Sequence, residues 1–82
     1  MADVRATAQI YDIGPADIAL HRADGYPYMH LRLAPNVFAV LGRTGCDPGV
    51  EAAAMRELAR VAAEAAAELE SRVAAREDGG HG

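Results

Sequence analysis

The sequence of 82 residues has one cysteine and no lysine. A lone cysteine, Cys46, cannot close an intramolecular disulfide, and no Cys/His cluster has zinc spacing, so we expect no metal and no cofactor. The apolar runs fall short of the ~20 residues that span a bilayer, and the N-terminus has neither a basic n-region nor an apolar h-region. These features predict a cytoplasmic protein without a membrane anchor.

The absence of lysine also bears on charge and on nucleotide chemistry. All 8 basic residues are arginine, which together with 19 alanines is typical of a high-GC bacterial or phage genome. A phosphate-binding loop of the Gly-x-x-x-x-Gly-Lys-Ser/Thr type is excluded. The net charge is -4, and residues 1–47 carry four arginines against five aspartates. Phosphate-driven nucleic-acid binding needs a clustered positive excess, so the charge balance argues against it.

The pattern of apolar residues predicts an α+β fold, an antiparallel four-stranded β-meander followed by one long C-terminal α-helix (ββββα). Apolar residues alternate in the first half and recur at helical spacing in the second. We expect a single domain over residues 1–76 and a disordered tail over 77–82. The predicted strands are residues 4–11, 18–22, 28–33 and 36–42, and the predicted helix is residues 48–76.

The second and third strands are expected to form a hairpin, because Asp24-Gly25 is a favoured two-residue turn. This turn predicts apolar pairs on one face, namely Leu20 with Met29 and Ile18 with Leu31. The other face would pair Asp17 with Arg32, Ala19 with His30, and His21 with Tyr28.

The register of the fourth strand stays open from sequence. A two-residue Pro35-Asn36 turn would place Phe38 and Val40 on the core face of the sheet. A three-residue turn would instead place Val37, Ala39 and Leu41 there. In both cases the strand is apolar on both faces, so a partner could cover the second face.

The helix is predicted from its start signals and its composition. Asp47 is suited to the N-cap and Pro48 to the first helical position, and good helix formers follow. Its apolar stripe consists of Val50, Ala54, Leu58, Val61, Ala65, Leu69 and Val73. Such a helix is about 43 Å long, whereas a six-residue strand spans about 20 Å.

This mismatch in length predicts a homodimer, since the sheet could not cover the distal part of the stripe. The expected dimer interface comprises Leu58, Ala62, Ala65, Leu69 and Val73. Small alanines would let two helices approach closely, and the leucines would fill the ends of the contact. The alternative is a helix that frays after about Ala67.

One face of the predicted hairpin is chemically varied and is the candidate partner-binding surface. Its residues are His21, Tyr28, His30 and Arg32, with Arg43 beside them. Cys46 precedes the helix, but no motif connects it to a general base, so whether it is reactive stays open. We therefore expect a small non-enzymatic protein-interaction module (a regulator, adaptor or inhibitor) that acts as a homodimer. The alternative function is a nucleic-acid-binding regulator that uses Arg22, Tyr28, His30 and Arg32.

Overall fold

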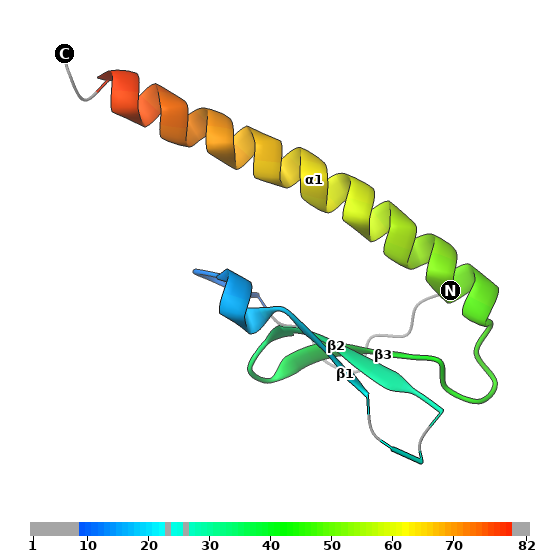
Figure 1. Cartoon of the computed structure of the whole chain (residues 1–82). Helices are drawn as coiled ribbons and strands as arrows, with labels where there is room; N and C mark the ends of the chain where they lie inside the picture. The colour runs from blue at the N-terminus through cyan, green and yellow to red at the C-terminus, as the bar shows by residue number, and fades with distance from the viewer. Residues whose placement is uncertain (1–8, 23, 26, 80–82) are drawn as a thin grey trace. The chain divides into compact units, whose positions relative to one another are not determined.

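The structure is a computed structural model that describes residues 9–22, 24–25 and 27–79. The chain divides into two compact units, Met1–Pro48 and Gly49–Gly82. The first unit holds a short 3-10 helix, η1 (Pro15–Asp17), and three strands, β1 (Ala19–Arg22), β2 (Met29–Ala34) and β3 (Val37–Leu41). The described residues of the second unit belong to helix α1, which begins at Pro48, the last residue of the first unit, and ends at Gly79 (Figure 1). The prediction of a single domain stays a prediction.

The sheet is antiparallel in the order β1-β2-β3, which confirms the α+β class and the meander topology. Within the described residues it has three strands, where the sequence predicts four. Residues 9–11 of the predicted first strand belong to no strand, and residues 4–8 lie outside the described part of the chain. Asp12 adopts a φ of 55°, a left-handed conformation that breaks an extended path toward η1.

The β1–β2 hairpin forms, but its predicted register is wrong by two residues. Leu20 lies opposite Leu31 rather than Met29, and His21 lies opposite His30 rather than Tyr28. The predicted register would place Pro27 opposite Arg22 within the ladder, and proline has no N–H to donate there.

The pair nearest the turn is therefore Arg22 with Met29, and Pro27 lies outside the ladder. Gly25 still takes a turn conformation, with a φ of 83°. A shift of two residues keeps every side chain on its predicted face, because strand side chains alternate with period two.

The same two-residue shift changes the cross-strand pairs on the polar face. Ala19 lies opposite Arg32, so neither the predicted Asp17–Arg32 nor the Ala19–His30 pair forms. Asp17 and Ile18 precede β1, with Asp17 closing η1, so the Ile18–Leu31 pair does not form either.

A bulge decides the register of β3. The turn at Pro35 and Asn36 is two residues long, since Ala34 pairs with Val37, but the pairing shifts between Arg32 and Ala34. Beyond this bulge, Phe38 lies opposite Arg32 and Ala39 opposite Leu31. A bulge inserts one extra residue and so exchanges the faces of the strand that follows. Ala39 and Leu41 therefore lie on the same face as Leu31. The sequence predicts this arrangement for a three-residue turn, although the observed turn has two residues.

The sheet consequently has two distinct faces. We call one the aromatic face, because it carries the rings of the sheet; its residues are His21, Tyr28, His30, Arg32, Phe38 and Val40. The other face carries Leu20, Arg22, Met29, Leu31, Ala39 and Leu41. No described residue of the chain is fully buried. Neither face is therefore sealed from solvent in the way of an ordinary protein core.

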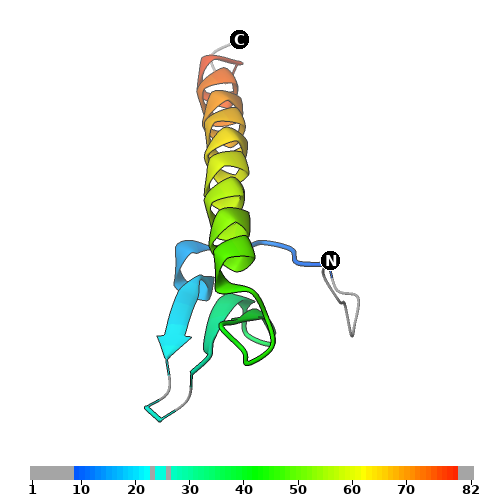
Figure 2. The ribbon, with the colours of Figure 1, turned by 90° about the vertical axis from the view of Figure 1, so that its right-hand side faces the viewer.

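Helix α1 is continuous from Pro48 to Gly79, 32 residues, in both views (Figures 1 and 2). Its start confirms the predicted first helical position of Pro48. It ends three residues beyond the predicted Arg76, so residues 77–79 belong to the helix rather than to a tail. Glycine at the end of a helix is common, because its backbone readily leaves the helical conformation.

Candidate protein-interaction surfaces

Three rings form a continuous row on the aromatic face. The rings of Tyr28 and His30 are stacked with centroids 5.6 Å apart, and those of His30 and Phe38 with centroids 4.5 Å apart. Both distances lie in the range where aromatic pairs attract beyond their buried area. His30 is therefore held between two aromatic neighbours, and stacking orders the three rings of the row Tyr28–His30–Phe38.

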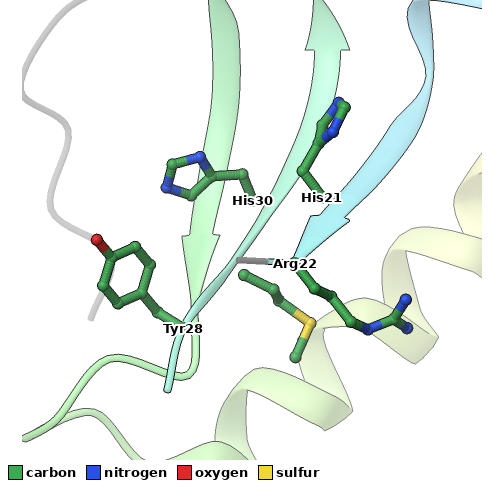
Figure 3. Close-up of a pocket in the computed structure, with 5 residues that line it drawn as sticks. His21, Arg22, Tyr28 and His30 are labelled. Carbon is green, nitrogen blue, oxygen red and sulfur yellow. The ribbon is translucent and has the colours of Figure 1, made fainter. Parts of the chain in front are cut away.

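The strand register places these rings. Tyr28 and His30 are two residues apart along the chain and point to the same side of the sheet, as Figure 3 shows. Phe38 reaches His30 diagonally, because its direct partner on β2 is Arg32. Without the bulge, Phe38 would lie on the opposite face and the row would stop at His30. The sequence alone does not identify Phe38 as a site residue, because nothing in it marks the bulge.

His21 adds an exposed imidazole beside this row. It lies on β1 directly opposite His30, whereas the neighbouring Arg22 extends to the other side of the hairpin (Figure 3). A shallow hollow of about 80 Å³ is lined by His21, Arg22, Tyr28, Met29 and His30. The structure thus brings His21, Tyr28 and His30 together as predicted and adds Phe38 to them. It does not bring Arg22 onto their face.

Arg32 has a structural task that the sequence does not reveal. Its Nε donates a hydrogen bond to the carbonyl oxygen of Asp17 at 3.1 Å, and its Nη2 donates one to the carbonyl oxygen of Ala16 at 3.1 Å. The carboxylate of Asp17 accepts a hydrogen bond from the amide of Gly14 at 2.9 Å. The guanidinium therefore fastens η1 to β2.

Arg43 and Cys46 belong to the loop between β3 and α1. The amide of Cys46 donates a hydrogen bond to the carbonyl oxygen of Arg43 at 3.0 Å, and the intervening Gly45 has a φ of 92°. Both side chains are exposed. Arg43 follows β3, which ends at Leu41, one residue before the predicted end of this strand at residue 42.

Helix α1 presents an exposed apolar stripe. Leu58 is 39% exposed, Leu69 56% and Val73 49%. A shallow hollow on the helix is lined by Ala65, Glu68, Leu69 and Arg72. The predicted dimer-interface residues therefore share a helical face, and their larger side chains are accessible.

Ion pairs also lie along α1. Arg60 binds Glu57 and also Glu64, whose Oε2 lies 3.3 Å from Nη1, and Arg72 binds Glu68 at 3.2 Å. The hydrogen bond from Arg60 lowers the pKa of Glu57, and the bond to Glu57 raises the pKa of Arg60. These pairs stabilise exposed helix turns and lie in open solvent, so their contribution is small.

Within the described ranges, no group of three or more His, Cys, Asp or Glu side chains is arranged to hold a metal ion. In the same part of the chain, no helix has both the length and the apolar character needed to cross a bilayer. No family model matches the sequence, and neither a characterised protein nor a solved structure matches it.

Proposed function

We propose that the protein is a small, non-enzymatic protein-interaction module that acts as a homodimer through the apolar stripe of α1. The observation that carries this proposal is the exposure of Leu58, Leu69 and Val73 on one face of a 32-residue helix. Contiguous exposed apolar surface of this kind marks an interaction site in soluble proteins.

The dimensions of the two units support the same proposal. Thirty-two helical residues rise about 48 Å at 1.5 Å per residue, and the six residues of β2 span about 20 Å. Whatever their placement, the sheet is too short to cover the whole stripe. A second copy supplies an equally long apolar helix, and two-fold homodimers are the commonest assemblies.

The aromatic face is the second surface of the proposed module. We assign it to a protein partner, with His21, Tyr28, His30 and Phe38 as contact residues and Arg43 as a peripheral charge. Aromatic side chains bury large areas at low entropic cost, and those of the row Tyr28–His30–Phe38 are already ordered by stacking. Arg32 contributes less, because its guanidinium is engaged with η1.

The homodimer is tested by light scattering and by thermal unfolding at several concentrations. We expect a mass about twice the chain mass of 8.6 kDa and an unfolding midpoint that rises with concentration. Leu69→Glu should give a monomer, because the dimer would bury an unpaired charge. Ala67→Glu, which introduces the same charge away from the stripe, should remain dimeric. A monomeric wild-type protein with a concentration-independent midpoint would refute the proposal.

The alternative, a nucleic-acid-binding regulator, keeps one supporting observation, the stacking surface of Tyr28, His30 and Phe38. The arginines proposed for this alternative, Arg22 and Arg32, are poorly placed to bind phosphates. Arg22 lies on the other face, Arg32 donates to backbone carbonyls, and the net charge is -4. We therefore rank it below the protein-interaction module.

A further inference from the structure

The apolar residues of α1 include a series with the spacing of a coiled coil. Spacings of three and four residues alternate through Met55, Leu58, Ala62, Ala65 and Leu69, which we call the α1 seam. This is the a/d pattern along which two helices interlock side chains. The seam has leucine near each end and alanine at its centre, so two helices could approach most closely between Ala62 and Ala65.

The surface of α1 has a feature that fits such packing. The hollow lined by Ala65, Glu68, Leu69 and Arg72 is bounded by four residues spaced as neighbours on adjacent turns. In interlocked helices, each apolar side chain enters a hole made by four residues of the facing helix. The ion pair between Arg72 and Glu68, at 3.2 Å, holds the polar rim of this hole.

Charge decides between the two directions in which a second α1 could lie. In a parallel, in-register pair, Arg72 would face the partner's Arg72 and Arg76 the partner's Arg76, because both residues continue the spacing of the seam beyond Leu69. In an antiparallel pair, Leu58 faces the partner's Leu69, and Ala62 faces the partner's Ala65. The same alignment places the stem of Arg72 over the partner's Met55 and brings Arg76 opposite the partner's Glu51. Like charges repel in the first arrangement and opposite charges attract in the second.

We propose that two copies of the chain pack their α1 seams antiparallel, centred on Ala62 and Ala65, with Glu51 and Arg76 facing each other across the two ends. This inference rests on the homodimer proposed above and specifies its geometry. The two alanine layers set a close helix–helix distance, and the leucine layers on either side complete the apolar contact. The arrangement is isologous, so each contact occurs twice.

Cross-linking between single cysteines distinguishes the two directions. In a Cys46→Ser background, Ala54→Cys and Ala75→Cys each add a thiol beside the seam without replacing a seam residue. The antiparallel dimer brings position 54 near position 75 of the other copy, whereas the two positions 54 lie about 28 Å apart along the axis. A bis-maleimide with a reach of about one helix diameter, ~10–12 Å, should join the first pair only.

We expect the mixture of the two variants, one of them ¹⁵N-labelled, to give a mixed cross-linked dimer by mass spectrometry. Each variant alone should give at least tenfold less product. Self-cross-linking of both single variants would establish a parallel pair and overturn the inference. Absence of the mixed product in a protein that light scattering shows to be dimeric would also overturn it, by moving the interface elsewhere. A monomeric mass would instead refute the proposed homodimer itself.

A charge reversal gives a second, independent measurement. Arg76→Glu should raise the dimer dissociation constant about three- to fivefold, as expected for the loss of two surface pairs. Glu51→Arg combined with Arg76→Glu should recover part of this loss, since arginine is less favourable than glutamate in the first turn of a helix. An unchanged dissociation constant in Arg76→Glu would contradict the antiparallel seam.

Discussion

The guanidinium of Arg32 on β2 donates to the carbonyl oxygen of Asp17, which ends η1 fifteen residues earlier. With its second bond to Ala16, it satisfies two carbonyls of a helix that is only three residues long. Residues that look like a solvent-facing charge pair in the sequence therefore form a structural link. The predicted Asp17–Arg32 cross-strand pair is replaced by contacts between the arginine and the backbone.

Arg32→Ala should therefore destabilise the sheet unit by about 1–2 kcal/mol, since two carbonyls lose a charged donor, the carbonyl of Asp17 in a part-buried setting and that of Ala16 in an exposed one. Urea unfolding followed by the near-ultraviolet tyrosine signal measures this change. Arg43→Ala is the matched control, because it removes an exposed arginine of the same unit and should change the free energy of unfolding by under 0.5 kcal/mol. Equal stability of the two variants would show that the link to η1 is not stabilising.

Gly42→Ala should cost more stability than Gly25→Ala. Both glycines have positive φ, 80° and 83°, so alanine is strained by roughly 1–2 kcal/mol at either position. At Gly42, a Cβ would also lie 3.0 Å from the carbonyl oxygen of Pro27, whereas Gly25 has open space. Thermal unfolding of the two variants isolates this steric contribution, and equal midpoints would contradict it.

The ion pairs of α1 predict a small loss of helix stability in acid. The folded-state pKa of Glu57 lies below its ordinary value of 4.5 because Arg60 binds the carboxylate. The ion pair of Glu57 with Arg60 therefore contributes its full stabilisation of the helix above pH 4.5. This stabilisation is lost as the pH falls through the lowered folded-state pKa of Glu57. Far-ultraviolet circular dichroism between pH 6 and pH 2 should show a shallower decline for Glu57→Gln than for Glu70→Gln. Identical profiles would show that the pair does not act on folding.

Short DNA and RNA should show no gel retardation at about 150 mM salt with tens of micromolar protein, because the charge is unfavourable for phosphate contacts. A shifted band lost in Arg22→Ala would favour the nucleic-acid alternative over the interaction module. A band that survives both Arg22→Ala and Tyr28→Ala would reject the aromatic face as its site.

Local signals predicted the elements well where one physical cause dominates. Pro48 starts α1 as expected, and Asp24-Gly25 forms a turn between two antiparallel strands. The side-chain alternation correctly grouped His21, Tyr28 and His30, because a two-residue error in register leaves the faces unchanged.

The remaining features depend on interactions between distant residues. The bulge that turns Phe38 toward His30 has no glycine or other local signal near Leu33. Pro27 is a local signal for the observed register. A two-residue Asp24-Gly25 turn would place this proline within the ladder, where it has no N–H to donate. The task of Arg32 could not be predicted, because it requires the position of η1 relative to β2, which only the folded chain defines.

Strand β3 forms one edge of the sheet and consists of five apolar residues, Val37 to Leu41, without a charge or a proline. Edges of this composition are templates for uncontrolled strand addition, which most proteins prevent with lysine, proline or an inward charge. The nearest such gatekeepers in the chain, Pro35 and Arg43, each lie two residues outside the strand. Partial unfolding should therefore lead to aggregation through this segment, and Val40→Lys should slow it.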